Sequence, residues 1–181
     1  IKIRNFKVFK DVEFRDLRGF NVLVGANGAG KTTFFDIFGF LKDCLASNVR
    51  QALAVRGHFK EVVTRGSELK PISIELAFRA PIAGSSRLVR YILEIQEQDG
   101  HPVVSREVLR YTRFGGGKPY EFLRFANGEG DAIVNERELS DQTAERREPQ
   151  ALDSPDILAI KGLGQFQRFE AASAFRSLIE N

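Results

Sequence analysis

The sequence predicts an α/β fold in which a buried strand, a glycine-rich loop and an amphipathic helix are followed by an antiparallel sheet. Three observations support this prediction. An almost wholly apolar run, residues 20–24, leads directly into Gly25. Apolar residues recur at helical spacing after residue 31, and apolar and polar residues alternate strictly in the middle of the chain. We expect a mixed core of strands around the loop, with the antiparallel sheet beside it.

Composition limits the class of protein before any motif is considered. The chain has 181 residues, of which 43% are hydrophobic and 28% charged, as is typical of a globular domain. The net charge of +3 is too small to indicate a nucleic-acid partner by itself. The single cysteine, Cys44, cannot form an internal disulfide, which favours a reducing, cytoplasmic location. No apolar run approaches the roughly 18 residues needed to span a bilayer, so we predict no membrane partner.

Residues 1–46 are expected to hold three strands, the glycine-rich loop and a helix. The polar pair Lys10-Asp11 separates the first two strands, and the apolar run that follows suits a central strand covered on both faces. The expected elements are a strand through Ile1, Ile3 and residues 6–9, a strand over residues 12–17, a strand over residues 20–24, and a helix from Lys31 to about Ala46 whose apolar residues are Phe34, Ile37, Phe38, Leu41 and Leu45.

Residues 47–140 are expected to form mainly an antiparallel β meander. Residues 47–70 show only a weak pattern of short helix or loop. Strict alternation then predicts half-buried strands at residues 72–78 and 89–95, and Asp99-Gly100 predicts a hairpin turn. Further strands are expected at residues 103–114, 120–125 and 132–134.

The last part of the chain is expected to be an exposed connection followed by a helix. Residues 141–156 are charged and contain Pro149 and Pro155, which indicates the connection. Residues 157–181 predict a C-terminal amphipathic helix, whose apolar residues are Phe166, Phe169, Ala172, Phe175 and Ile179. This helix has no C-cap and the chain has no methionine, so we expect the sequence to belong to a longer protein whose second half is missing.

The motif with the most specific chemistry is Gly25-x-x-x-x-Gly30-Lys31-Thr32, which has the spacing of a phosphate-binding P-loop. Backbone N–H groups of such a loop turn inward to bind phosphate oxygens, and the N-terminal end of the next helix adds to the attraction. Lys31 is the predicted catalytic residue, because its charge reaches the β- and γ-phosphates, and the Thr32 hydroxyl is predicted to bind Mg²⁺. The predicted phosphate-binding loop is Gly25, Ala26, Asn27, Gly28, Ala29, Gly30, Lys31 and Thr32. The alternative is a chance glycine-rich turn, but the strand before it and the helix after it favour the P-loop.

The inner residues of this loop, Gly-x-Asn-Gly-x-Gly-Lys-Thr, follow a strand that contains Ile3-Arg4-Asn5-Phe6. This combination resembles the head domains of the SMC/RecF-like ATPases, which are relatives of the ABC transporter ATPases. Residues 154–166, Ser-Pro-Asp-Ile-Leu-Ala-Ile-Lys-Gly-Leu-Gly-Gln-Phe, are similar to the bacterial "predicted ATPase" branch of that group, AAA-like proteins with an ABC-type core. The resemblance implies a P-loop NTPase of the α/β class, with residues 1–181 as one ABC/SMC-head-like N-terminal lobe that has an antiparallel β-sheet and a mixed core.

The resemblance also implies roles for individual residues. Lys7 matches a basic position that lies near the nucleotide in relatives, and a solvated strand lysine is an equally good explanation. Gln165, with Gln167 as the next candidate, matches a glutamine that senses Mg²⁺ and the attacking water, and a surface helix glutamine is the alternative. The family's loop roles carry over to Gly25, Gly28, Gly30, Lys31 and Thr32, with Asn27 as the loop asparagine and Thr33 as a backbone donor.

Two motifs that hydrolysis needs in that family are not found. A Walker B strand ends in Asp-Glu and holds Mg²⁺, but the nearest segment, residues 132–136, lacks the aspartate. Residues 139–143, Leu-Ser-Asp-Gln-Thr, are only superficially similar to the Leu-Ser-Gly-Gly signature because they lack its glycines. We therefore expect this chain to bind Mg-ATP and, on its own, to hydrolyse it very slowly.

The leading hypothesis is the ATP-binding lobe of an SMC/RecF-like ATPase, in which two heads form a homodimer around ATP and hydrolysis separates them. The alternative is a nucleotide-gated interaction module without significant hydrolysis. A third hypothesis, a small-molecule kinase or GTPase, lacks the guanine-specifying Asn-Lys-x-Asp motif. The resemblance leaves DNA open as a partner, but the candidate basic residues share their segments with glutamates, as in a mixed solvated face. These residues are Arg87, Arg90, Arg106 and Arg110, with Glu94, Glu97 and Glu107.

Overall fold

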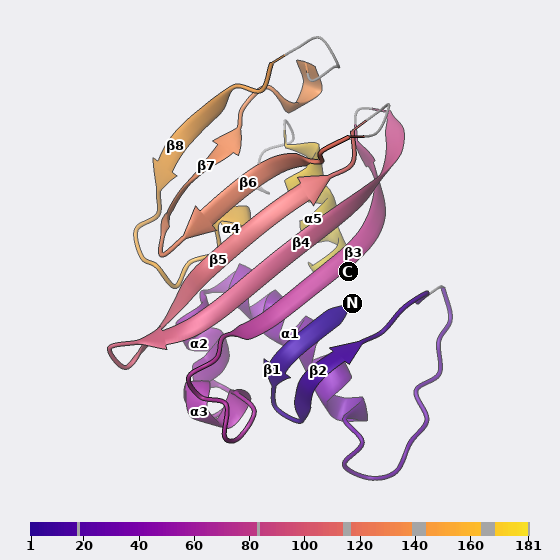
Figure 1. Cartoon of the computed structure of the whole chain (residues 1–181), viewed down its shortest axis with the longest axis vertical. Helices are drawn as coiled ribbons and strands as arrows, with labels where there is room; N and C mark the ends of the chain where they lie inside the picture. The colour runs from indigo at the N-terminus through magenta and orange to yellow at the C-terminus, as the bar shows by residue number, and fades with distance from the viewer. Residues whose placement is uncertain (18, 83, 114–116, 139–143, 164–168, 181) are drawn as a thin grey trace.

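The computed structural model describes residues 1–17, 19–82, 84–113, 117–138, 144–163 and 169–180. Within these ranges one antiparallel sheet faces a layer of helices (Figure 1). The elements are, in chain order, β1 (Lys2–Phe6), β2 (Phe9–Glu13), α1 (Lys31–Ala46), α2 (Val49–Ala54), α3 (His58–Val62), β3 (Ile72–Ile82), β4 (Ser85–Gln98), β5 (His101–Tyr111), β6 (Tyr120–Ala126), β7 (Glu129–Ile133), a 3-10 turn (Glu136–Glu138), β8 (Arg147–Ala151), α4 (Ala159–Leu163) and α5 (Glu170–Glu180).

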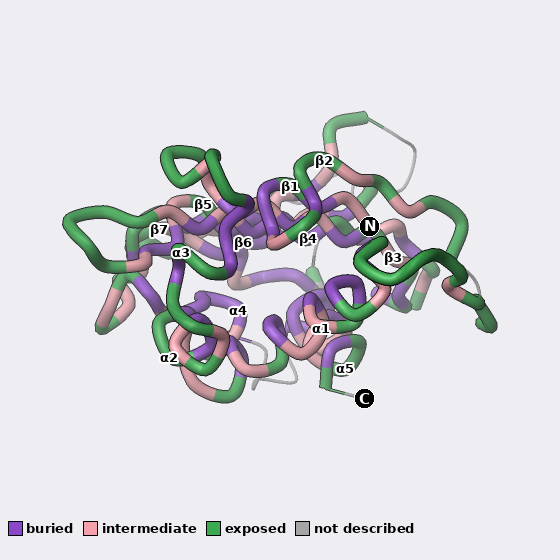
Figure 2. Tube along the Cα trace, turned by 90° about the horizontal axis from the view of Figure 1, so that it is seen from below, coloured by how far each residue is buried: buried purple, intermediate pink, exposed green. Residues whose placement is uncertain are grey.

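The sheet has eight strands in the order β2-β1-β3-β4-β5-β6-β7-β8, and each neighbouring pair is antiparallel. Figure 2 shows the strands in one layer and α1, α2, α4 and α5 in the other, with buried chain between them. Alternating strand residues supply the sheet's half of this core. Tyr91 of β4, for example, lies fully buried against Phe175 of α5, with ring centroids 4.0 Å apart.

The predicted meander is confirmed from β3 onward. Its hairpins turn at Asp99-Gly100 and Asn127-Gly128, where both residues of each pair have positive φ angles of 51° and 77°, and 52° and 84°. This is the backbone of two-residue hairpin loops whose twist matches that of the strands. Asn, Asp and Gly tolerate positive φ better than other residues, which explains why the sequence located the Asp99-Gly100 turn correctly.

The helix predicted from Lys31 to about Ala46 is also confirmed. Its inner face buries four of the five predicted apolar residues, whereas Phe38 is only partly buried and Phe40, which was not predicted, is buried. Cys44 lies on the same face; its thiol is free and fully buried, and burial raises its pKa. Within the described residues, the predicted C-terminal helix is found as the two helices α4 and α5, and residues 164–168 lie outside the described ranges. No helix in the described ranges is long and apolar enough to cross a membrane.

Two strand predictions are wrong in detail. The first hairpin turns at Lys7-Val8 rather than at Lys10-Asp11, because Asn5 and Lys7 adopt positive φ angles of 58° and 50°. Lys10 and Asp11 instead lie within the solvated edge strand β2.

Residues 147–151, which were expected within an exposed connection, form the edge strand β8, which pairs with β7. Pro149 is compatible with this place, since an edge strand leaves one side without ladder hydrogen bonds.

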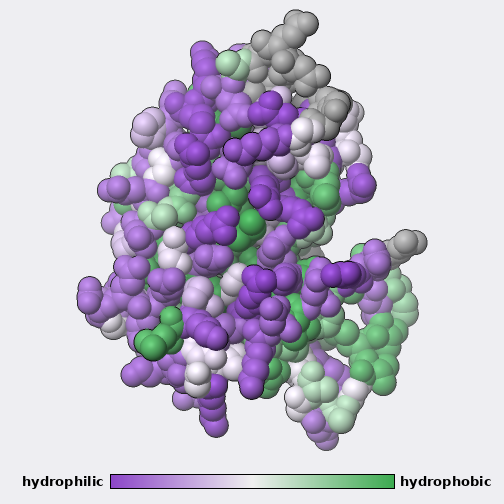
Figure 3. Space-filling view, viewed as in Figure 1, coloured by the Kyte–Doolittle hydropathy of each residue, from purple (hydrophilic) through white to green (hydrophobic). Residues whose placement is uncertain are grey.

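The strand predicted at residues 20–24 is not formed, and with it the predicted mixed core is missing from the described sheet. Phe20, Val22 and Val24 are 87%, 67% and 90% exposed, while Leu23 packs partly against the core. The physical reason is that a strand buried on both faces needs neighbours on both edges, and no described segment pairs with this one. Figure 3 shows apolar surface gathered on the projecting loop at lower right.

Candidate functional site

The glycine-rich loop lies between an irregular stretch after β2 and the first turn of α1. Residues 24–29 are exposed, whereas Gly30 is buried at the start of the helix. Gly28 and Gly30 have φ angles of 82° and 92°, in the left-handed region that side chains rarely adopt. The loop therefore turns back on itself as the P-loop prediction requires, although the strand expected before it is absent.

Gly30 is needed for space, and Gly25 lies in a tight contact. A β-carbon at Gly30 would lie 2.5 Å from Cε1 of Phe9 and 3.1 Å from Cγ2 of Val8, so the end of the loop packs directly against the β1–β2 turn. A β-carbon at Gly25 would lie 3.2 Å from that of Ala29, which shows how closely the two ends of the loop approach each other. Gly28 has open space around it, so only its positive φ requires glycine there.

The N-terminus of α1 is suited to bind an anion. Its N-cap residue is Gly30, which has no side chain to accept hydrogen bonds from the first helical N–H groups. The first helical bond runs from the N–H of Phe34 to the carbonyl of Gly30, at 2.9 Å. The amides before it, including that of Thr33, lie at the positive end of the helix dipole. A phosphate at this end would gain both hydrogen bonds and favourable charge.

The Lys31 side chain bonds the backbone at the start of the loop. Its ammonium donates to the carbonyl oxygens of Gly25 and Ala26, at 2.6 and 2.8 Å. The positive charge therefore sits at the loop's first residues, beside the position that a triphosphate takes in a P-loop. The side chain of Thr32 is exposed and available to a metal ion, whereas Thr33 is 9% exposed, which suits a backbone role.

Lys7 lies beside α1 rather than on the loop itself. Its ammonium is 2.6 Å from Oδ2 of Asp36, and Arg56 donates to the other oxygen of that carboxylate at 2.9 Å. Burial by itself would raise the pKa of Asp36, but the Lys7 and Arg56 cations outweigh it and hold the pKa below its usual value. Asp36 follows Thr32 by four residues and so lies on the same face of the helix, one turn further along. The sequence analysis missed Asp36, although this spacing from Thr32 was a signal for it.

The segment nearest to a Walker B motif has a structural role. Glu136 is 3% exposed and accepts from the N–H groups of Glu170 and Ala171, at 2.6 and 3.3 Å, so it caps the N-terminus of α5. Burial raises its pKa to about 7. The signature-like residues 139–143 and the candidate glutamines Gln165 and Gln167 lie outside the described residues.

The sequence analysis also missed a second buried glutamate that caps a helix. Glu107 of β5 is fully buried and accepts from the N–H groups of Ala159 and Ile160, at 2.6 and 3.1 Å, so it caps α4. It also accepts from the Tyr91 hydroxyl at 3.0 Å, and burial raises its pKa to about 7. The sequence analysis placed Glu107 on a solvated face, and that placement is wrong because residue 107 points to the helix-covered side of the sheet.

Three of the four basic residues considered for nucleic acid are buried or paired with a carboxylate. Arg87 is only 6% exposed, so its guanidinium is not presented at the surface. Arg90 pairs with Glu75 at 2.6 Å, and Arg106 lies 3.5 Å from Glu94. The charges of Arg90 and Arg106 are therefore neutralised by carboxylates, as in a mixed solvated face.

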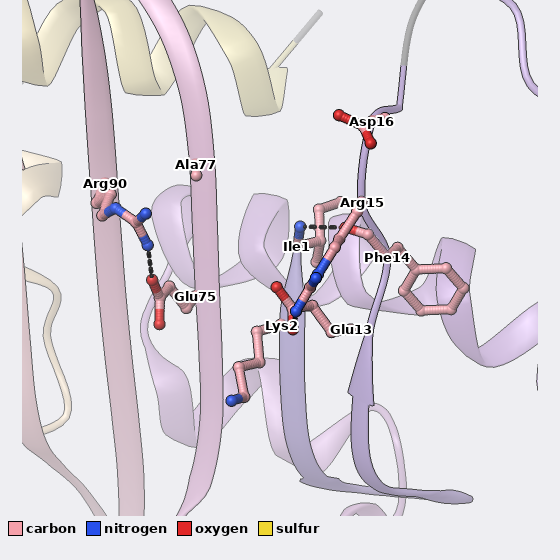
Figure 4. A pocket seen from close by; sticks show the side chains of 9 residues that line it. All are labelled: Ile1, Lys2, Glu13, Phe14, Arg15, Asp16, Glu75, Ala77 and Arg90. Atoms are coloured by element: carbon pink, nitrogen blue, oxygen red, sulfur yellow. Dashed lines mark hydrogen bonds and ion pairs between the residues drawn. The ribbon is translucent and has the colours of Figure 1, made fainter.

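A groove of about 430 Å³ lies where β1 begins, between the end of β2 and the strand β3 (Figure 4). Its charges are matched, since Arg90 bonds Glu75 and Arg15 bonds Glu13 at 2.8 Å. Such a surface offers an anion no surplus of positive charge. The groove is lined by Ile1, Lys2, Glu13, Phe14, Arg15, Asp16, Glu75, Ala77 and Arg90.

The tight glycine loop, the lysine inside it and the uncapped helix that follows define the class of this chain as a P-loop nucleotide-binding domain. A family model described as "AAA domain, putative AbiEii toxin, Type IV TA system" matches residues 20–161, and the chain belongs to that family. A P-loop ATPase-like domain is therefore indicated by both the site and the family. Comparisons with curated proteins and with solved structures gave no match.

ATP and Mg²⁺, which AAA ATPases generally use, fit the residues present. Gly28 leaves open space on the loop, Gly25 and Gly30 bring its ends together, and the Thr32 hydroxyl is exposed beside it. No group of three or more His, Cys, Asp and Glu side chains gathers anywhere in the described ranges. The Thr32 hydroxyl is thus the loop side chain suited to bind the metal ion, and phosphate oxygens would supply further ligands.

Proposed function

We propose that this chain binds the triphosphate of Mg-ATP in the loop formed by residues 25–32. The observation that carries the proposal is the Lys31 ammonium, held at 2.6 and 2.8 Å from two loop carbonyls directly before an uncapped helix N-terminus. Neutral carbonyl oxygens are weaker partners for an ammonium than phosphate oxygens. A triphosphate can therefore take over the Lys31 charge while the loop amides bind its remaining oxygens.

Each residue of the loop has a defined part in this proposal. Gly28 and Gly30 give the backbone its inward turn, and Thr33 contributes its N–H from the first turn of α1. Lys31 stabilises the negative charge of the phosphates, and Thr32 holds the metal ion through its hydroxyl. Bound Mg²⁺ supplies charge neutralisation at the β- and γ-phosphates.

On a larger scale, we propose that residues 1–181 form the first lobe of an ATPase head of the SMC/RecF type. Support comes from the exposed apolar residues 20–24, where the family match also begins, because such a run is suited to pairing in a second lobe. That lobe would bring the Walker B and signature motifs and would follow the helix at residues 170–180. Two complete heads would then close around ATP as a homodimer and separate after hydrolysis.

A specific observation also favours the alternative, a nucleotide-gated interaction module. The only Walker B-like acid among the described residues, Glu136, is occupied as the cap of α5 and so is not free to position a water. On this alternative, nucleotide binding alone would control assembly with a partner. Both versions share the same loop, and they differ in the rate of hydrolysis once the complete protein is assembled.

Nucleotide affinity tests the shared part of the proposal. We expect Lys31→Ala to weaken Mg-ATP binding by about 1.5–3 kcal/mol, the usual size of a hydrogen bond to a charged group. Lys42→Ala is the matched control on the same helix, since the Lys42 ammonium contacts only the carbonyl of Glu180 among the bonds described, at 3.1 Å. Titration calorimetry with and without Mg²⁺ would measure both. Equal affinities for the chain and for Lys31→Ala would contradict the proposal.

The turnover of this chain alone tests the expected lack of hydrolysis. Kinases and related phosphoryl-transfer enzymes turn over at about 1–100 s⁻¹ with their metal-binding and catalytic carboxylates in place. We expect a rate far below about 1 s⁻¹ here, because the sequence contains neither a Walker B Asp-Glu pair nor the glycines of the signature motif. A phosphate-release assay at saturating Mg-ATP measures the rate, and turnover near that lower limit would contradict the expectation.

A further inference from the structure

Lys7 is held near the start of α1 by an ion pair that is partly open to solvent. It occupies the tip of the β1–β2 turn, where its N–H donates to the carbonyl of Val62 at 2.6 Å and fixes the backbone. Its ammonium lies 2.6 Å from Oδ2 of Asp36, and the two side chains are 33% and 22% exposed. The backbone is thus anchored while the charged end of the side chain remains accessible.

The carboxylate of Asp36 has a second cationic partner, Arg56, besides Lys7. Arg56 donates to Oδ1 of Asp36 at 2.9 Å, and the same guanidinium bonds Asp43 at 2.7 Å and the carbonyl of Ala52 at 2.8 Å. The Arg56 side chain is only 11% exposed, so this arrangement is well fixed. If Lys7 left, Asp36 would still be neutralised by Arg56.

The ion pair between Lys7 and Asp36 is the more exposed of the two ion pairs on this carboxylate. The Lys7 side chain is 33% exposed, whereas that of Arg56 is 11% exposed and also bonds Asp43 and the carbonyl of Ala52. An ion pair that is partly open to solvent stabilises less than a buried one with further hydrogen bonds. Of the two cations on this carboxylate, Lys7 is therefore the one that can be withdrawn at lower cost.

The phosphate-binding loop is within reach of this ammonium. Asp36 lies one helical turn, about 5.4 Å along the axis, beyond Thr32 on the same face of α1. The loop also touches the turn that carries Lys7, since Gly30 packs against Val8 and Phe9. A flexible lysine stem can cover this distance without movement of its backbone.

We propose that Asp36 competes with the nucleotide for the ammonium of Lys7, holding it on α1 in the free chain and releasing it to the phosphates when a triphosphate binds. This inference rests on the proposed function of the loop. A triphosphate carries several negative charges, whereas the single charge of Asp36 is already shared with Arg56. Coulomb attraction therefore favours transfer of Lys7 to the phosphates once they are present. Asp36 acts as a positioning residue that lowers the affinity of the free chain for nucleotide.

Binding of a non-hydrolysable Mg-ATP analogue to four proteins tests this competition: the unmodified chain, Asp36→Asn, Lys7→Ala and the double variant. We expect Asp36→Asn to bind about two- to five-fold tighter, the contribution of a partly exposed ion pair. Lys7→Ala should bind about ten-fold weaker, because it loses a charged contact to the phosphates. In the Lys7→Ala background, Asp36→Asn should change nothing, since the two side chains act through each other.

Asp43→Asn is the matched control, because it removes a carboxylate that Arg56 binds on the same helix but leaves the Lys7–Asp36 pair intact. Its affinity should equal that of the unmodified chain. Unchanged or weaker binding by Asp36→Asn would overturn the competition, and so would a Lys7→Ala variant that binds normally, which covers the case of an unfolded Asp36→Asn. If the unmodified chain binds no better than Lys31→Ala, the proposed function itself fails and the competition falls with it.

Discussion

At the scale of single residues, two glycines of the phosphate loop differ in what they require. Gly30 combines a φ of 92° with a site where a β-carbon would lie 2.5 Å from the Phe9 ring, and that ring is 6% exposed and held in the core. Gly28 has a similar φ of 82° but open space around it. The two positions therefore separate backbone strain from steric overlap.

We expect Gly30→Ala to lower the free energy of unfolding by about 2–4 kcal/mol, since it adds overpacking to backbone strain. Gly28→Ala should cost only about 1 kcal/mol, because strain acts there alone. Urea denaturation of both variants, followed by circular dichroism, measures the difference. Equal losses would show that Phe9 moves aside and that the contact with the loop is not tight.

Asn5 shows what sequence alone could and could not predict at this scale. The Asn-Phe pair was noticed as part of a family resemblance, but no pattern gave its physical role. In the structure Asn5 has a φ of 58° and is 4% exposed, and its amide donates to the carbonyls of Ser67 and Lys70 at 3.0 and 2.7 Å. It fixes the strand β1 to a segment more than 60 residues away. Such contacts depend on the tertiary fold, so spacing along the chain cannot predict them.

At the scale of elements, two buried glutamates attach the short helices to the sheet. Glu107 caps α4 and Glu136 caps α5, and each carboxyl lies in the core side of the molecule. A cap of this kind stabilises a helix end by about 0.5–2 kcal/mol. Their burial has the opposite effect on the ionised form, which explains why the pKa of each is raised to about 7.

These two groups predict that stability falls as the pH rises from about 4.5 to about 7. In that window the unfolded chain has released the protons that the folded chain still holds, so each rise in pH favours unfolding. The loss should be on the order of 2 kcal/mol for each carboxyl. Asp36 and Asp131, whose pKa values are lowered, act in the opposite sense but below this window.

Urea unfolding across this pH range measures the effect, and the single variants Glu107→Gln and Glu136→Gln assign it. Each variant should be less stable near pH 5, since an amide group faces backbone N–H donors that the carboxyl accepted. Each should also remove about half of the pH dependence. A free energy of unfolding that is flat or rises with pH over this range would contradict the prediction.

The strands illustrate where periodicity works. Alternation located β3 and β4 because these strands have one covered and one solvated face, the condition that produces a period of two. It failed for β8, where residues 147–151 lie at the edge of the sheet with little burial and so carry no apolar alternation. It also misplaced the first turn, because the positive φ at Asn5 and Lys7 is not signalled by glycine or a polar run.

At the scale of the whole molecule, the turn of the glycine-rich loop and the helix after it were predictable, and the segment before the loop was not. Loop geometry is encoded locally, because Gly28 and Gly30 are placed where the backbone needs positive φ and Lys31 follows them directly. The strand expected at residues 20–24 depends instead on neighbours that no described segment provides. Asp36 and Arg56 meet Lys7 only through the packing of α1 against the β1–β2 turn, so their role had to come from the structure.

Substitutions at neighbouring residues of the exposed segment 20–24 should affect the stability of the chain differently. Val22 and Val24 are 67% and 90% exposed, so replacing both with serine should change the free energy of unfolding by less than about 0.5 kcal/mol. It should also lower the binding of a hydrophobic dye, because it removes exposed apolar surface. Leu23→Ser is the matched control, because Leu23 packs partly against the core, so we expect this variant to lower the free energy of unfolding by about 1 kcal/mol.

Thermal or urea unfolding measures the stability of each variant, and dye fluorescence measures the exposed apolar surface. A double variant that is as destabilised as Leu23→Ser would mean that residues 20–24 are already covered in the free chain, and the proposed second lobe would then lose its apolar docking strand.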